Sequence, residues 1–308
     1  MKTTRSHTRE PAGIWPVLYA FFDSANNLDR HAMREQVRHV LAAGAPGIVV
    51  LGLATEVNRL SADEKREIVD WAVVDIEGRV PLAVTVTGDT VEEQVSLAEY
   101  ALTRGAETFI LQPPSIRGRD ESFYFDFFCE IMRRIDAPCG IQNAPEYLGV
   151  GLSTPSLIEL AHRRSNFSWL KCEGPALVVH ATIEGLRAQD ASLPVFNGRG
   201  GQELLDNLRA GCAGMIVAPD AFDRQVRIYN SFVDGQDQLA LSGYMDILPE
   251  IVFVMQSLEN LTCYGKRIAA WRMGLEVKHD RGTSPNPFGL ACARRFASQL
   301  KTYRSQED

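Results

Sequence analysis

Residues 42–51 read Ala-Ala-Gly-Ala-Pro-Gly-Ile-Val-Val-Leu, a helix end that passes through a glycine into a short apolar strand. The same form recurs twice, with Gly105 before the segment 108–111 and Gly211 before the segment 215–217. A glycine suits the left-handed position that commonly ends a helix. The recurrence indicates a chain built from repeated helix–strand units, which favours a parallel sheet.

Eight short apolar segments, several of them rich in β-branched residues, have the pattern of strands that are buried on both faces. They span residues 14–21, 47–52, 81–86, 108–112, 138–143, 168–173, 194–197 and 215–218. Helical patterns separate them, and Ser-Ala-Asp-Glu at 61–64 and Thr-Val-Glu-Glu at 90–93 are typical of capping boxes at helix starts. This order predicts an α/β fold, a (β/α)8 TIM barrel over residues 12–222. A doubly wound sheet stays open as an alternative, although no strand is followed by G-x-G-x-x-G.

The strand signals stop after about residue 222. The remainder, through 241–261 and 286–303, has only helical patterns. Nothing rich in proline or serine separates it from the barrel, so residues 223–308 are predicted to be a C-terminal helical extension packed on the barrel.

Composition narrows the class of protein. The 308 residues are 45% hydrophobic and 23% charged, as in an average globular chain, which excludes disorder and coiled coil. A net charge of −7 argues against nucleic acid or an anionic membrane surface as a partner. No apolar run approaches about 18 residues, so no membrane span is expected.

The cysteines, the histidines and the N-terminus bear on compartment and metal binding. The basic start with Lys2, Arg5 and Arg9 resembles a signal peptide, but Pro16 interrupts the apolar run that follows. The six cysteines form no C-x-x-C pair, and the six histidines have no metal-ligand spacing. We therefore predict a cytoplasmic protein with reduced cysteines, no metal and no organic cofactor.

Lysine is scarce in this chain, with six residues against 26 arginines. Lys171 alone lies in a predicted barrel strand, toward the carboxyl end, where barrel active sites lie. One interpretation is a desolvated amine with a depressed pKa that forms a Schiff base with a carbonyl. The other is a buried salt bridge to Glu173, which points the same way by strand alternation.

Four further stretches carry a resemblance to a known family. Gly-Leu-Ala-Thr-Glu at 52–56, with Leu60, Ser61 and Glu64 after it, resembles the G-T-T-G-E…L-S-x-x-E segment of the dihydrodipicolinate synthase and N-acetylneuraminate lyase family. Asn-Ala-Pro at 143–145 resembles the second half of its Y-N-x-P, Lys171 stands at its G-[IV]-K, and Phe-Asp at 22–23 resembles its T-P-F-D. The resemblance implies a class I lyase, typically a homotetramer, that binds pyruvate or another 2-keto acid as an imine on Lys171.

The chain departs from the family pattern at several positions. Gln142 stands where the family has a proton-shuttling tyrosine, and Leu53 and Ala54 replace two threonines. Ser115 replaces a tyrosine that the neighbouring subunit usually lends, and the semialdehyde-binding arginine of the synthases falls near Tyr147. These departures favour a paralogue with a different substrate.

Gln142 together with Lys171-x-Glu173 resembles the branch that dehydrates 2-keto-3-deoxy sugar acids such as 2-keto-3-deoxy-L-arabonate. Glu173 can then be the proton carrier, or a counter-ion that only fixes Lys171. Thr55 is a candidate hydroxyl donor to the substrate carboxylate, helped by backbone N–H groups around Ala54, or else a loop threonine. Glu56 is interpreted as a structural hydrogen-bond acceptor.

Three more residues are candidates for substrate contact. Arg199, within Gly-Arg-Gly-Gly at 198–201, can hold a distal carboxylate or hydroxyls, or be a solvated arginine in a flexible turn. Asn143, from the family motif, is predicted to contact the substrate. Ile216 resembles the apolar family residue beside the bound keto acid, although most isoleucines in such strands are simply core.

The sequence therefore predicts a Schiff-base lyase for a pyruvate-like 2-keto acid, a dehydratase or aldolase of a 2-keto-3-deoxy sugar acid, with Lys171, Glu173 and Gln142 in its catalytic group. The expected partners are a small-molecule substrate and further copies of the chain in a tetramer or dimer. Two alternatives remain: a 4-hydroxy-tetrahydrodipicolinate synthase, and a non-catalytic keto-acid-binding protein.

Overall fold

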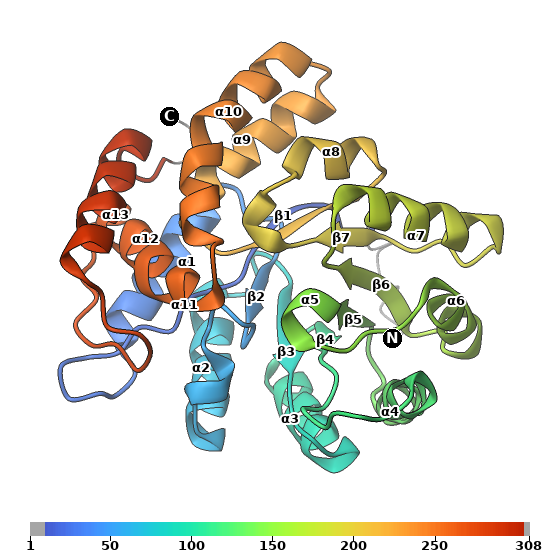
Figure 1. Ribbon diagram of the computed structural model, residues 1–308. Coiled ribbons are helices and arrows are strands. Elements are labelled where there is room, and N and C mark those ends of the chain that lie inside the picture. The colour runs from blue at the N-terminus through green and yellow to red at the C-terminus, as the bar shows by residue number, and fades with distance from the viewer. Residues whose placement is uncertain (1–9, 305–308) are drawn as a thin grey trace, which may run out of the picture.

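The computed structural model describes residues 10–304, in which eight parallel strands surround one interior (Figure 1). The strands are Gly13–Pro16 (β1), Ile48–Val50 (β2), Leu82–Val86 (β3), Thr108–Leu111 (β4), Cys139–Asn143 (β5), Phe167–Cys172 (β6), Val195–Asn197 (β7) and Gly214–Val217 (β8). From β2 to β8 each strand pairs with the next in the chain, and β8 pairs with β1. A parallel bridge between Val17, just after β1, and Val49 of β2 closes the ring. The predicted (β/α)8 barrel is confirmed, and the doubly wound sheet is excluded.

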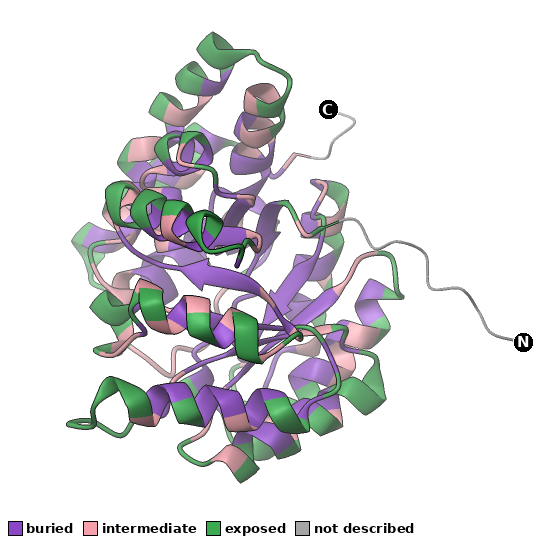
Figure 2. Ribbon diagram, turned by 90° about the vertical axis from the view of Figure 1, so that its right-hand side faces the viewer, coloured by how far each residue is buried: buried purple, intermediate pink, exposed green. Residues whose placement is uncertain are grey.

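Helices follow the strands and cover the barrel, with buried inner and exposed outer faces (Figure 2). They are Arg30–Ala42 (α1), Ala62–Ile76 (α2), Val91–Arg104 (α3), Glu121–Arg134 (α4), Pro145–Leu148 (α5), Thr154–Arg163 (α6), Ala176–Ala188 (α7), Leu204–Arg209 (α8), Phe222–Val233 (α9), Asp237–Val254 (α10), Leu258–Asn260 (α11), Lys266–Arg272 (α12) and Pro287–Leu300 (α13). Short 3-10 turns occupy Val57–Arg59 (η1) and Arg199–Gly201 (η2), and Leu261–Gly265 (η3) is a π-helix. Both predicted capping boxes form, at Ser61 and Thr90, and Gly105 ends α3 with a φ of 114°.

The first strand is shorter than the predicted segment 14–21. After the bridge at Val17 the chain leaves the sheet, and the backbone of Tyr19 turns to a side chain of α1. The Tyr19 N–H donates to Gln36 Oε1 at 2.8 Å, and Gln36 Nε2 donates to the Tyr19 carbonyl at 3.0 Å. A buried glutamine thus replaces a strand partner, which an apolar pattern alone does not reveal.

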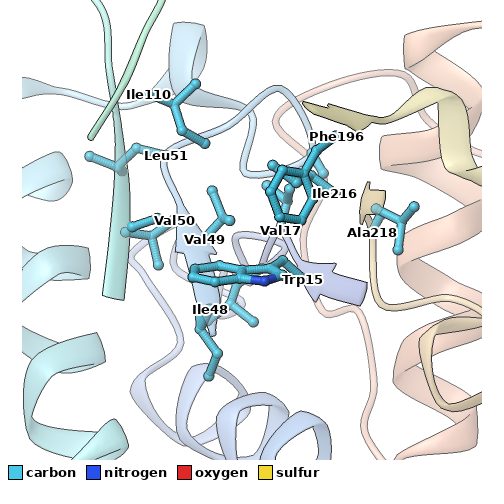
Figure 3. Packing of buried hydrophobic residues seen from close by; sticks show 14 of the residues in the cluster. Trp15, Val17, Ile48, Val49, Val50, Leu51, Ile110, Phe196, Ile216 and Ala218 are labelled. Carbon is cyan, nitrogen blue, oxygen red and sulfur yellow. The ribbon is translucent and has the colours of Figure 1, made fainter. Parts of the chain in front are cut away.

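The rings of Trp15 and Phe196 lie among aliphatic side chains in the buried interior (Figure 3). The Phe196 ring meets Trp15 and Trp169 edge to face, with centroids 6.3 and 5.8 Å away. Room for the indoles comes from glycines: a Cβ at Gly47 would lie 2.2 Å from Trp15, and one at Gly140 would lie 2.7 Å from Trp169. Because Trp169 precedes Lys171 by two residues on the same face of β6, this aromatic layer forms an apolar floor below the lysine.

The C-terminal helices lie together on one side of the barrel (Figure 1). The predicted boundary at 222/223 falls at the start of α9, which follows β8 and packs against β1 as a barrel helix. We therefore propose that the extension begins with α10. Among the described residues no single helix is long and apolar enough to cross a membrane; α10 with the segment 258–272 passes that test only as a pair bent by 108°.

The six cysteines are all unbridged, and Lys2, Arg5 and Arg9 lie outside the described residues.

A buried polar joint ties the extension to the barrel. The Tyr19 hydroxyl donates to Asp220 Oδ1 at 2.9 Å, and Arg272 Nη2 reaches both carboxylate oxygens of Asp223 at 2.8 Å. Glu250 of α10 is buried against this group, and burial together with the Asp220 carboxylate raises the pKa of Glu250 well above its ordinary value. Burial and the neighbouring Asp220 carboxylate therefore favour the protonated form of Glu250.

Replacing Glu250 with glutamine should stabilise the protein at neutral and alkaline pH. Native Glu250 holds a proton that the unfolded chain releases above about pH 4.5, so stability falls as pH rises toward the raised native pKa, by up to about 1.4 kcal/mol per pH unit. A glutamine amide is uncharged at every pH and takes up no proton, so this loss of stability does not arise in the variant. The melting temperature of Glu250→Gln should exceed that of the natural protein at pH 8, and the difference should vanish near pH 4. An equal gap at both pH values would contradict a protonated Glu250.

Candidate active site

Lys171 and Glu173 meet at the carboxyl end of β6. Lys171 is the penultimate residue of the strand and pairs in register with Gln142 of β5, so both side chains face the interior. Glu173 follows directly after β6, and its Oε2 lies 3.3 Å from Lys171 Nζ. Both side chains are more than 90% buried. The Lys171–Glu173 pair thus lies above the aromatic floor, shielded from water, where an interaction between charges is strong.

One amide side chain contacts the Glu173 carboxylate, and a second amide side chain orients the first. Gln142 Nε2 donates to Glu173 Oε2, and Gln142 Oε1 accepts from Gln112 Nε2 at 2.7 Å. Gln112 directly follows β4, so three neighbouring strands each supply one member of this chain. Gln142 therefore orients Glu173 without being able to exchange protons itself. The sequence analysis missed Gln112, although a polar residue after each of two adjacent strands was a usable signal.

The loop after β7 closes over the other carboxylate oxygen. The backbone N–H of Arg199 donates to Glu173 Oε1 at 3.3 Å. A Cβ at Gly198 would lie 2.0 Å from the same oxygen, so only glycine lets the carboxylate occupy this place. Glycine at 198 is thus explained by the close approach of Glu173 and not by turn flexibility alone.

Substituting Gly198 with alanine should displace Glu173 and cut turnover by about 10²-fold, the usual cost of moving a reacting group by about 1 Å. The clashing atom is the end of a side chain, so the fold should survive with little change in melting temperature. Gly174→Ala is the matched control, because its Cβ would meet only Val178 at 3.8 Å. Equal activity of the two variants, measured by steady-state kinetics, would contradict this placement of Glu173.

The loop after β2 offers backbone donors. Among the described residues, none accepts a hydrogen bond from the backbone N–H of Leu53 or Ala54, and these two consecutive groups can bind a carboxylate. The Thr55 hydroxyl has another partner in this structure. It donates to the Leu18 carbonyl at 2.6 Å, and a carbonyl can only accept, so the single hydroxyl proton is engaged there. A contact of Thr55 with the substrate stays a prediction.

Asn143 and Ile216 take different positions. The Asn143 side chain is bonded at both ends to the Leu152 backbone, donating at 2.9 Å and accepting at 2.7 Å. The structure does not bring Asn143 to the lysine; it fastens the loop that follows β5. Ile216 is buried in β8 in register with Trp15 and belongs to the interior wall.

A cavity of about 560 Å³ lies beside this group, lined by Leu53, Gln112 and Tyr147 among others. Gln112 connects it to the Gln142–Glu173 chain. Tyr147 of α5 stands beside the Arg199 side chain, and burial, followed by the nearby Glu173 charge, raises the pKa of Tyr147. The phenol is therefore neutral at physiological pH and can both donate and accept.

A second buried lysine was missed by the sequence analysis. Lys266 begins α12, is only 1% exposed and donates to Glu56, whose predicted role as a structural acceptor is confirmed. Burial lowers the pKa of Lys266, with Glu56 opposing that shift. Since Lys266 lies under the extension rather than on a strand, its burial follows from helix packing that local sequence does not show. Burial alone therefore does not single out Lys171.

Within residues 10–304, no three His, Cys, Asp or Glu side chains gather as a metal-binding group. The donors around Lys171 are an amine, a carboxylate and amides, a set suited to organic chemistry on a small carbonyl compound. Fold and site together define a (β/α)8 enzyme that binds a small molecule at the carboxyl ends of its strands.

The comparison with known proteins makes the class specific. The model of the dihydrodipicolinate synthetase family matches residues 10–279, and the chain belongs to this family. Three relatives are each 26% identical: a probable 2-dehydro-3-deoxy-D-pentonate aldolase from Escherichia coli (73% of this chain, 75% of the relative), a 4-hydroxy-tetrahydrodipicolinate synthase from Methanopyrus kandleri (77% and 79%) and an L-2-keto-3-deoxyarabonate dehydratase from Azospirillum brasilense (80% and 81%).

The solved structure of YagE, a family protein from Escherichia coli in complex with pyruvate, superimposes with a TM-score of 0.87 at 21% identity, covering 94% of this chain and 98% of that one. The predicted family and fold are confirmed, as is the prediction of an enzyme of the lyase class.

Proposed function

We propose that this protein is a Schiff-base lyase that dehydrates or cleaves a 2-keto-3-deoxy sugar acid at Lys171. The observation that carries the proposal is the buried Lys171–Glu173 pair, 3.3 Å apart, with Gln142 in contact with the carboxylate. The aldolase and dehydratase among the relatives act, by their names, on acids of this type.

The first step is imine formation. The Lys171 amine adds to the C2 carbonyl, and the resulting carbinolamine loses its hydroxyl with one proton as water, leaving a protonated imine. Lys171 gives up one ammonium proton before the amine attacks, and the leaving hydroxyl takes a proton back, so the overall step releases only water. The backbone N–H groups of Leu53 and Ala54 bind the C1 carboxylate, which fixes C2 above the lysine.

The imine then serves as an electron sink for one of two reactions. In dehydration, Glu173 takes a proton from C3, an enamine forms, and hydroxide leaves C4 with that proton as water. In a five-carbon acid a C5 proton then moves to C3, and the resulting enol passes its hydroxyl proton to C4, which gives the imine of 2-oxoglutarate semialdehyde. In cleavage, the C4 hydroxyl loses its proton to Glu173, the C3–C4 electrons pass to the imine, and C3 of the enamine regains the proton. One water finally hydrolyses the imine and restores the amine.

The structure bears on the alternative of 4-hydroxy-tetrahydrodipicolinate synthesis. Gln142 has no acid or base form, and the Thr55 hydroxyl proton is engaged by Leu18, so the described site lacks a hydroxyl relay at these positions. The relative named 4-hydroxy-tetrahydrodipicolinate synthase is 26% identical to this chain, as are the aldolase and the dehydratase, so sequence identity does not choose the substrate and an assay decides it.

The deciding experiment offers five- and six-carbon 2-keto-3-deoxy acids and measures both pyruvate and 2-oxoglutarate semialdehyde as products. We expect turnover of at least one acid and negligible synthesis from pyruvate and aspartate semialdehyde. Robust turnover in the latter assay would replace the proposal with the synthase. Binding without any turnover would favour a keto-acid-binding protein. A homo-oligomer, tetramer or dimer, and a cytoplasmic location remain predictions.

A further inference from the structure

We propose that Arg199, Tyr147, Glu146 and Glu203 form a charge-compensated subsite that accepts keto acids with an uncharged, hydroxylated far end and rejects those with a second anionic group. This inference rests on the proposed function and names its substrate class. It concerns the part of the substrate beyond the reacting carbons.

The position of Arg199 places this subsite at the edge of the lysine site. Its backbone N–H donates to Glu173 Oε1, whose partner oxygen lies 3.3 Å from Lys171. The residue holds a φ of 51°, a left-handed conformation that is uncommon outside glycine and often found where function requires it. The side chain therefore leaves the backbone only one residue from the gap that Gly198 provides for Glu173.

The charge of Arg199 is already compensated. Its Nη1 lies 3.5 Å from Glu203 Oε2 and 3.8 Å from Glu146 Oε2. One cation between two carboxylates leaves this group with a net charge of −1. A second carboxylate or a phosphate at the far end of a substrate would meet like charge, in a site that already holds Glu173. An arginine that recognises an anion is instead left free to bind it in a bidentate fashion.

Hydrogen-bonding capacity remains for neutral groups. Among the described residues, no hydrogen-bond partner meets Nε or Nη1 of Arg199, since both ion pairs are too long or poorly aligned for a hydrogen bond. Both atoms have almost no accessible surface, so a ligand meets this group through the Tyr147 phenol that hydrogen-bonds with the Arg199 side chain. The neutral phenol of Tyr147 stands beside them at the wall of the cavity. A neutral phenol with no surplus positive charge beside it matches a sugar hydroxyl.

The test compares two substrates that differ only at C6, a 2-keto-3-deoxy hexonate with a terminal CH2OH and the corresponding hexarate with a carboxylate. The natural protein should favour the hexonate by at least about tenfold in kcat/KM. In the double variant Glu146→Gln/Glu203→Gln, Arg199 gains an uncompensated charge, and this preference should fall about tenfold or reverse. In the natural protein Glu203 Oε2 accepts from the Ala176 N–H at 3.3 Å, and a glutamine at position 203 keeps an oxygen for this hydrogen bond. The single variant Glu146→Gln, at a half-exposed position, should shift the preference in the same direction by less.

Pyruvate separates this inference from the proposed function, because it has no far end. Exchange of its C3 protons in D2O and its borohydride trapping on Lys171 in the natural protein therefore test the proposed function alone. Trapping with an unchanged hexonate-to-hexarate ratio in both variants would overturn the subsite and leave the proposed function standing. A natural protein that favours the hexarate would also overturn it. Absence of trapping and exchange in the natural protein would instead refute the proposed function.

Discussion

Replacing Lys171 with arginine should abolish turnover of every 2-keto-3-deoxy acid that the natural protein uses. In the natural protein Lys171 Nζ lies 3.3 Å from the Glu173 carboxylate. Arginine keeps a positive charge at this position, so the buried pair and the fold should persist. A guanidinium stays protonated in proteins and cannot form the imine. We expect kcat to fall roughly 10⁴-fold or more, because covalent activation supplies a large share of an acceleration that enzymes carry to about 10⁶-fold and beyond.

Lys266→Arg is the matched control, since Lys266 is also buried and also paired with a glutamate. Lys266→Arg should lower the melting temperature, whereas the kcat of the folded protein should change little. Steady-state kinetics alongside thermal melts would test both expectations. Loss of kcat in Lys266→Arg with retention in Lys171→Arg would reverse the assignment of the reactive amine.

Exchanging Glu173 for glutamine should lower turnover by about 10²- to 10⁴-fold, the usual contribution of a positioned acid–base group. The substitution preserves shape and removes the proton site, while Lys171 remains able to form the imine. Rapid-quench measurement should therefore show normal imine formation and slow release of product. If Glu173 is only a counter-ion, imine formation should change instead, because the Lys171 amine loses its partner charge.

Much of the fold follows from local sequence. The eight apolar segments, the two capping boxes and the glycine helix ends are all short-range patterns, and all are present, although the first strand ends earlier than expected. The departure after Pro16 arises because Gln36, seventeen residues beyond Tyr19, bonds to both backbone groups of Tyr19. No pattern within residues 14–21 signals that partner.

In the candidate site, too, contacts within one strand could be predicted from the sequence and contacts between strands could not. The contact of Lys171 with Glu173 could be predicted because strand alternation puts both residues on one face. The hydrogen bond of Thr55 to Leu18, and the placing of Gln112 against Gln142, join different strands and depend on the register of the closed barrel. Lys266 is buried because the C-terminal helices pack over it, and no periodic pattern in the sequence predicts that packing.

The most direct test of the central claim is borohydride reduction in the presence of pyruvate, followed by peptide mapping of the modified lysine. We expect a single reduced adduct on Lys171, present in Glu173→Gln and absent from Lys171→Arg. An adduct on Lys266 or on any other lysine, or no adduct with any 2-keto acid of the panel, would contradict it.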